Sequence, residues 1–152
     1  MDVGGKLFSG HLGRHMIFQK VKYQDLNSRQ KETYNFQKVS AILADYGFAT
    51  IKLNDDWQSA DFIAQHIDGE TFLKIQLKGR LTFSKKYLNK NIQICFPYNG
   101  NWYLFDHDKV LTIFLDRYKD SMATSESWAT YGGYSWGVLS TDILKILSEY
   151  KL

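Results

Sequence analysis

The chain has 152 residues, of which 44% are hydrophobic and 23% charged, a composition that excludes a disordered tail and predicts one domain with a single core. One proline and one cysteine, Cys95, exclude a proline-rich linker array and a disulfide framework, and they favour a reducing, intracellular setting. No apolar run reaches the roughly eighteen residues of a transmembrane helix, and the N-terminus holds no apolar stretch of signal-peptide length. We therefore expect a cytoplasmic protein without a membrane partner.

Residues 1–16 combine four glycines with no clear hydrophobic period. We predict a flexible leader there, or partly a cloning remnant, ahead of a single domain over residues 17–152. From Asn27 or Ser28 a helix is predicted, because the apolar residues that follow recur at helical spacing. Those residues are Tyr34, Val39, Ile42, Leu43 and Tyr46. Gly47 then stands where the C-terminal cap of a helix belongs.

An antiparallel hairpin is the strongest local prediction. A strand is expected at 48–53 and a polar connection at 54–59. Two alternating runs follow, at 60–67 and 71–78, separated by Asp68-Gly69. This pair is the one most typical of a two-residue hairpin turn, so the two runs are predicted to pair as neighbouring strands.

The hairpin turn also predicts which side chains share a face. If Asp68 and Gly69 are the two loop residues, the numbers of every opposed pair sum to 137, which places Asp61 opposite Gln76. Lys78 lies diagonal to Asp61 on the same face, within reach of a long side chain. Lys74 shares that face, while Leu73, Ile75 and Leu77 point the other way into an apolar layer.

The rest of the chain predicts a second hairpin and two helices. In chain order these are a basic, weakly patterned segment at 79–91, strands at 92–98 and 101–106 around Asn99-Gly100, a helix at 108–118, a tract rich in Ser, Gly and aromatic residues at 121–137, and a helix capped by Ser140. This order predicts a mixed α/β domain, with a central mixed sheet flanked by helices.

Positive charge is concentrated in one part of the chain. Between Glu70 and Asp106 there is no acidic residue but there are six basic ones, namely Lys74, Lys78, Arg80, Lys85, Lys86 and Lys90. A basic field of this kind suits a phosphate backbone, although a solvated lysine-rich loop is the ordinary alternative. Arg80 alone among them can contact guanine in a bidentate manner. Trp128 and Tyr131, in the aromatic tract, are predicted either to stack on bases, to line an oligomer interface or to pack in the core.

The face that carries Asp61, Gln76 and Lys78 suits metal-dependent phosphodiester hydrolysis. Asp61 could hold one or two Mg²⁺ or Mn²⁺ ions, with the Gln76 side chain and the backbone carbonyl of Leu77 as further oxygen ligands. Lys78 would orient the attacking water or stabilise charge on the phosphate. Glu32 could add a second carboxylate if the first helix packs on this sheet. It is otherwise a favourable acid near a helix N-terminus.

These residues resemble the PD-(D/E)-XK nuclease superfamily, which has the restriction-enzyme fold. The resemblance covers about residues 32–80: Asp61 is followed fifteen residues later by Gln76-Leu77-Lys78 and is preceded by a helix with Glu32. It implies a restriction-endonuclease-like core in which Asp61 is the central metal ligand, Gln76 the counterpart of the second acidic residue, Lys78 the catalytic lysine and Glu32 the first-helix acid. Two positions depart from the pattern, because Ala60 replaces a proline and Gln76 replaces an acid.

With Gln76 in the place of the second acidic residue, the motif resembles that of the small bacterial (cyanobacterial) group I intron-encoded homing endonucleases of this superfamily. That resemblance implies a sequence-specific double-strand DNA endonuclease that acts as a homo-oligomer, a dimer or a tetramer, since one active site cuts one strand. A restriction-like or resolvase-like nuclease is an alternative. A nucleic-acid-binding domain of the same fold that has lost catalysis is a further alternative. A third class is an oligomerisation module built from the aromatic C-terminal half.

Other candidate residues have simpler interpretations. Asp55 and Asp56 are expected to be solvated turn acids. The sequence Asp106-His107-Asp108 could bind a metal, but adjacent side chains point apart and an isolated histidine is usually structural. His66 is predicted on the hairpin face opposite Asp61. Cys95 is predicted to be a small buried hydrophobe.

Overall fold

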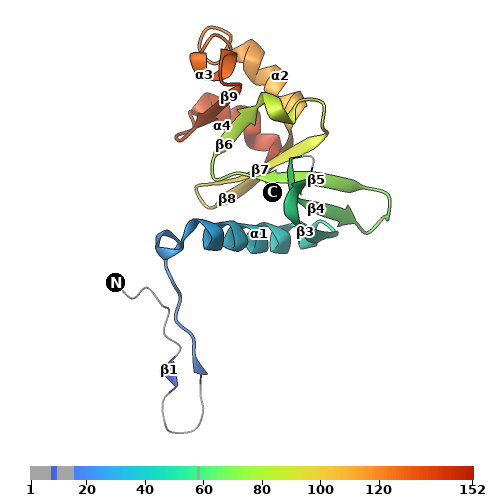
Figure 1. Cartoon of the computed structure of the whole chain (residues 1–152), viewed down its shortest axis with the longest axis vertical. Helices are drawn as coiled ribbons and strands as arrows, with labels where there is room; N and C mark the ends of the chain where they lie inside the picture. The colour runs from blue at the N-terminus through green and yellow to red at the C-terminus, as the bar shows by residue number, and fades with distance from the viewer. Residues whose placement is uncertain (1–7, 10–15, 58) are drawn as a thin grey trace. The chain divides into compact units, whose positions relative to one another are not determined.

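Figure 1 shows the computed structural model, which describes residues 8–9, 16–57 and 59–152. The chain forms two units, residues 1–37 and residues 38–152. In the first unit, β1 (Phe8–Ser9) pairs with β2 (Met16–Ile17) in antiparallel fashion, and η1 (Tyr23–Asp25) follows. The flexible leader predicted for residues 1–16 lies largely outside the described residues.

The first helix, α1 (Ser28–Asp45), begins where the sequence predicted it. Asn27 and Gln30 cap the start of this helix. The Asn27 N–H donates to the side-chain oxygen of Gln30, and the Gln30 N–H donates to the side-chain oxygen of Asn27, both at 2.9 Å. This is a capping box, which satisfies two N–H groups that a helix start leaves without partners. The predicted C-terminal stop is also confirmed, because Gly47 has φ +81°, a left-handed conformation that favours glycine.

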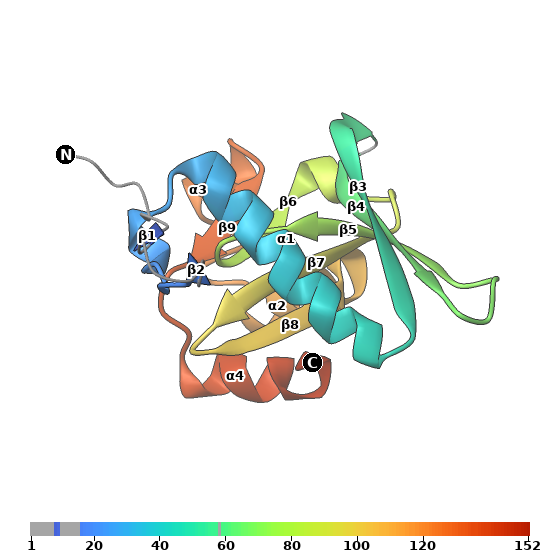
Figure 2. The ribbon, with the colours of Figure 1, turned by 90° about the horizontal axis from the view of Figure 1, so that it is seen from below.

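The second unit contains a five-stranded sheet in the order β3-β4-β5-β7-β8. Neighbouring strands are antiparallel except β5 and β7, which are parallel, so the predicted mixed sheet is confirmed. The strands are β3 (Phe48–Trp57), β4 (Ala60–His66), β5 (Phe72–Leu77), β7 (Ile92–Tyr98) and β8 (Asn101–Asp106). Figure 2 shows β3 and β8 at the two edges.

The register of the β4–β5 hairpin is the predicted one, but its turn is wider. The paired residues from Phe62↔Ile75 to Gln65↔Phe72 all keep the expected offset. The His66 N–H donates to the Thr71 carbonyl at 2.9 Å, so four residues, not two, form the loop. The Asp68 carboxylate explains the difference: it accepts from the N–H groups of Glu70 and Thr71 at 2.9 and 2.8 Å and from the Thr71 hydroxyl, bonds that lower the pKa of Asp68 well below its usual range.

The second hairpin, β7–β8, has the predicted two-residue turn. Tyr98 pairs with Asn101, and the two residues between them, Asn99 and Gly100, have φ +48° and +78°. Positive φ at both central positions matches the right-handed twist of the flanking strands.

Strand β3 is longer than predicted. The polar connection expected at 54–59 is wrong for residues 54–57, which continue the strand to Trp57 with a register shift after Lys52. Asp55 is therefore an exposed strand residue rather than a turn acid, and Asp56 also lies within β3. Because β3 is an edge strand, polar residues are tolerated there, and charge on an edge discourages pairing with other chains.

A two-stranded sheet and three helices complete the unit. Strand β6 (Leu81–Ser84) pairs with β9 (Gly133–Trp136), and neither strand was predicted. The helices are α2 (His107–Arg117), α3 (Glu126–Ala129) and α4 (Thr141–Leu147), with short turns η2 (Lys85–Tyr87) and η3 (Ser148–Tyr150). Ser140 caps α4 as predicted, accepting from the Ile143 N–H at 3.2 Å. None of the helices within the described ranges has the length and apolar character that crossing a membrane requires.

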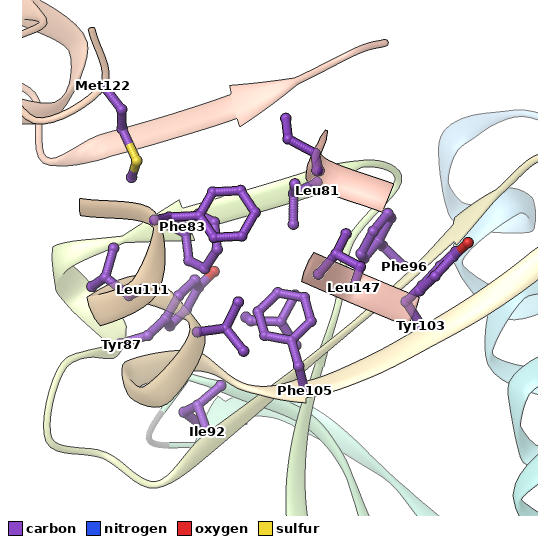
Figure 3. Packing of buried hydrophobic residues seen from close by; sticks show 14 of the residues in the cluster. Leu81, Phe83, Tyr87, Ile92, Phe96, Tyr103, Phe105, Leu111, Met122 and Leu147 are labelled. Carbon is purple, nitrogen blue, oxygen red and sulfur yellow. The ribbon is translucent and has the colours of Figure 1, made fainter. Parts of the chain in front are cut away.

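The hydrophobic core joins the small sheet and helices to the main sheet, as Figure 3 shows. Phe83 of β6 lies at its centre: its ring centroid is 5.6 Å from that of Phe105 on β8 and 4.9 Å from that of Phe114 on α2. Figure 1 places α2 and α4 over one face of β7 and β8. The last turns of α1 belong to the same unit, where Ser40 accepts a hydrogen bond from Thr50 of β3 at 2.8 Å. The expected central sheet flanked by helices is thus confirmed.

Substituting Gly47→Ala tests the helix stop. We expect it to lower the free energy of unfolding by about 1–2 kcal/mol, because a residue with a side chain is strained at φ +81° and its Cβ would lie 3.2 Å from Nε2 of His66. Urea denaturation measures the change. Gly79→Ala is the matched control, since a Cβ there meets no atom within 4 Å; equal losses in the two variants would contradict the role of Gly47.

Candidate functional site

Asp61 is the second residue of β4, and its carboxylate is tied to the neighbouring strand. Its Oδ2 accepts a hydrogen bond from the backbone N–H of Leu77, the last residue of β5, at 2.8 Å. A hydrogen bond to an ionised acceptor is stronger than one between neutral groups. On the other side of β5, the Lys78 N–H donates to the Cys95 carbonyl of β7 at 2.8 Å. The backbone at residues 77–78 is therefore held from both sides.

Gln76 and Lys78 lie on the same face of the sheet as Asp61. Continuing the observed β4–β5 register by one pair places Gln76 opposite Asp61, and Lys78 follows two residues later. All three side chains are half-buried, whereas Ile75, which points to the other face, is fully buried. The structure thus brings three of the predicted site residues together, and it places the Leu77 backbone beside them.

Two lysines contact one buried aromatic ring next to this face. Nζ of Lys78 lies 5.4 Å from the ring centroid of Tyr87, and Nζ of Lys86 lies 5.0 Å from it. Tyr87 is fully buried and is part of the core in Figure 3. A cation over an aromatic face is attracted by the negative charge of that face. Sequence reasoning missed Tyr87, although the sequence Lys85-Lys86-Tyr87 places it directly beside the basic residues.

Two of the other predicted DNA-binding lysines, Lys85 and Lys90, have contacts of their own. Lys85 lies over Trp128, its Nζ 5.3 Å from the ring centroid, and it donates to the Ala129 carbonyl at 3.4 Å. Lys90 donates to the Ser59 hydroxyl at 3.3 Å. Lys74 is half-buried on β5, and Arg80 is exposed just beyond that strand.

The two aromatic candidates differ in accessibility. Trp128 is 6% exposed and belongs to the hydrophobic core, whereas Tyr131 is 78% exposed. Of the three roles considered for Trp128, core packing is the one that its burial fits. Tyr131 alone of the two presents a ring on which a base could stack.

The Asp61 face offers oxygen atoms that could bind a metal ion. No group of three His, Cys, Asp or Glu side chains able to hold a metal ion occurs among the residues that the structure describes. Glu32 is exposed on α1 in the first unit, so its predicted role as a second carboxylate remains a prediction. The donors that the described residues offer on the Asp61 face include the Asp61 carboxylate, the Gln76 amide oxygen and the Leu77 backbone carbonyl. This set fits Mg²⁺, which is commonly held by one or two carboxylates and keeps several waters.

His107 is a buried structural histidine, not a metal ligand. It is fully buried, and its Nε2 lies 3.1 Å from the backbone N of Ser84. Because a backbone N–H can only donate, Nε2 is the acceptor and Nδ1 carries the proton. The Nδ1–H group donates a hydrogen bond to the Asp108 carboxylate at 2.8 Å. Burial lowers the pKa of His107, against the opposing effect of Asp108 and Asp106. Asp106 caps α2 by accepting from the Lys109 N–H at 2.9 Å, so this acidic-histidine sequence begins a helix.

His66 and Cys95 have contacts away from the Asp61 face. Nδ1 of His66 lies 3.1 Å from Asp68, and the ring packs edge-on against Phe48. Cys95 is fully buried in β7, and this burial raises the pKa of its thiol far above the usual range. It is the small buried hydrophobe that the sequence predicted.

Comparisons with known proteins give structural likenesses only. No protein-family model matches the sequence, and no curated protein matches it significantly. Hjc, a Holliday junction resolvase from the archaeon Archaeoglobus fulgidus, is similar with a TM-score of 0.42 and 18% identity, over 51% of this chain and 74% of that one. The bacterial homing endonuclease I-Ssp6803I is similar with a TM-score of 0.48 and 12% identity, over 82% of this chain and 86% of that one.

The neutral state of His107 predicts a pH dependence of stability. The pKa of His107 in the folded state lies below the ordinary 6.5. At a pH between these two values the unfolded chain therefore binds a proton that the folded chain does not. We expect the free energy of unfolding to fall as the pH drops below about 6.5, by up to about 1.4 kcal/mol per pH unit. Urea denaturation at several pH values measures it.

His107→Gln should flatten this pH dependence, because glutamine keeps an acceptor for the Ser84 N–H and does not titrate. His66→Gln is the control, since His66 is partly exposed and lies outside this network. An unchanged slope in His107→Gln would show that another group is responsible.

Proposed function

We propose that this protein is a metal-dependent DNA endonuclease that hydrolyses phosphodiester bonds at the Asp61 face of the β4–β5 hairpin. The observation that carries the proposal is the Asp61 carboxylate, held by the Leu77 N–H at 2.8 Å, with Gln76 and Lys78 on the same face. A carboxylate, a neutral oxygen ligand and an ammonium group at one place are the groups that this reaction needs.

Asp61, the Gln76 side chain and the Leu77 carbonyl would hold Mg²⁺ or Mn²⁺. When bound, such an ion supplies positive charge that polarises the phosphate and makes a water more acidic. The Leu77 N–H fixes the direction of the carboxylate before any ligand arrives. Lys78 would contact an oxygen of the scissile phosphate and stabilise the negative charge that grows there during the reaction.

Double-stranded DNA is the proposed substrate. Lys78 and Lys86 lie beside the site, while Lys74, Arg80, Lys85 and Lys90 would contact the backbone further along, and exposed Tyr131 could stack on a base. Because one active site cuts one strand, a double-strand break requires two copies, and we propose a homo-oligomer. The resemblance of the motif to homing endonucleases makes a homing-type, sequence-specific activity the proposed form; a restriction-like or resolvase-like nuclease is the nearest alternative.

One observation favours a second function, a DNA-binding domain without catalysis. Gln76 carries no charge, and no three-acid cluster exists within the described part of the chain. A protein that retained the basic residues but lacked a sufficient metal site would still bind DNA through its lysines.

Asp61→Asn separates the two functions. The asparagine side chain still offers an oxygen to the Leu77 N–H but has lost the charge that a metal ion needs. We expect cleavage of plasmid DNA in the presence of Mg²⁺ to fall by about a hundredfold or more, with the melting temperature and the metal-free affinity for DNA nearly unchanged. Lys78→Ala should also abolish cleavage.

Asp55→Asn is the matched control, because it makes the same change at an exposed position on β3. Full cleavage by Asp61→Asn would reject the site. Salt-sensitive DNA binding by the unmodified protein with no metal-dependent cleavage would instead support the binding domain.

A further inference from the structure

Lys78 and Lys86 come from different elements but meet at one ring. Lys78 directly follows β5, and Lys86 lies in η2. Their Nζ atoms lie 5.4 and 5.0 Å from the centroid of the Tyr87 ring, so the two ammonium groups are no more than about 10 Å apart. An anion that reached both ammonium groups would be attracted by two positive charges at once.

The position of the ring is fixed by the start of α2. The Ser84 N–H, just before η2, donates to Nε2 of His107 at 3.1 Å, and the Asn89 N–H, just after it, donates to Oδ2 of Asp108 at 2.9 Å. The Tyr87 ring also packs edge-on against His107, with centroids 5.4 Å apart at 82°. The segment is thus anchored on both sides of Tyr87, so the ring is in place before any ligand binds.

Lys85 provides the internal contrast. It neighbours Lys86 in the same turn and carries the same charge, and both side chains are exposed. Yet its Nζ lies 5.3 Å from the Trp128 ring and 3.4 Å from the Ala129 carbonyl. General attraction of DNA by positive charge would treat the two lysines alike, whereas the geometry assigns them to different places.

We propose that Lys78 and Lys86 form one phosphate-binding unit on the Tyr87 ring, which holds a phosphate of the DNA backbone at the Asp61 face. The proposal rests on the proposed function for the identity of its ligand. Tyr87 acts as a positioning residue, because both ammonium groups contact its ring. In this proposal Lys85 contacts the DNA backbone independently of Lys78 and Lys86.

A double-mutant cycle in metal-free DNA affinity tests this unit. The binding of a short fluorescein-labelled DNA duplex is measured in EDTA for Lys78→Gln, Lys86→Gln and the double variant. Because one phosphate needs both ammonium groups, we expect the double variant to lose less affinity than the product of the two single losses, by about threefold or more. The parallel cycle with Lys78→Gln and Lys85→Gln should be multiplicative. The proposed unit would be wrong if the affinity losses multiplied in both the Lys78/Lys86 and the Lys78/Lys85 cycle. It would also be wrong if the two cycles showed equal coupling.

Tyr87 is tested through the same measurement. Tyr87→Phe retains an aromatic ring and should preserve the Lys78–Lys86 coupling, whereas Tyr87→Leu should remove it. If Tyr87→Leu does not fold, the lysine cycle still decides the proposal, since Lys86 is exposed and tolerates substitution. These affinities are independent of cleavage: coupling in a protein that cuts no DNA would leave the unit standing while rejecting the endonuclease.

Discussion

The hydrogen bond from the Leu77 N–H to the Asp61 carboxylate is the contact on which the proposed site depends. It joins the beginning of β4 to the end of β5, at the place where Gln76 and Lys78 project from the same face. An extended side chain on a strand end is otherwise free to rotate, and ordering it costs conformational entropy. Here the sheet backbone orients the carboxylate, so a ligand that needs it meets a group already in position.

The segment between β5 and β7 supplies the second constraint. It leaves the sheet after Leu77, forms β6 and η2, and returns as the parallel neighbour of the strand it left. The pairing of β6 with β9 and the bonds to His107 and Asp108 hold this excursion against the core. As a result the basic part of the chain follows a fixed path, and Lys86 contacts the same Tyr87 ring as Lys78.

The sequence predicted what local patterns determine and missed what distant pairing determines. The β4–β5 register followed from strict alternation, and it survived a wider loop because a symmetric lengthening leaves the strand offset unchanged. Strands β6 and β9 escaped prediction, because each is short and finds its partner far along the chain. The full burial of Tyr87 and His107 also escaped prediction, because periodicity does not reveal it. Glu32 illustrates the remaining limit: its helix was predicted correctly, but a pattern does not say which sheet residues a helix faces.

The proposed function requires a divalent metal ion at Asp61, and paramagnetic broadening by Mn²⁺ in ¹H–¹⁵N NMR spectra tests this requirement. Titration with Mn²⁺ should first broaden the backbone amide signal of Leu77 and the side-chain amide signals of Gln76, because paramagnetic relaxation falls steeply with distance from the ion. The same titration of Asp61→Asn should leave these signals sharp. Broadening that centres on another carboxylate, such as Asp116, or that persists in Asp61→Asn, would contradict the account.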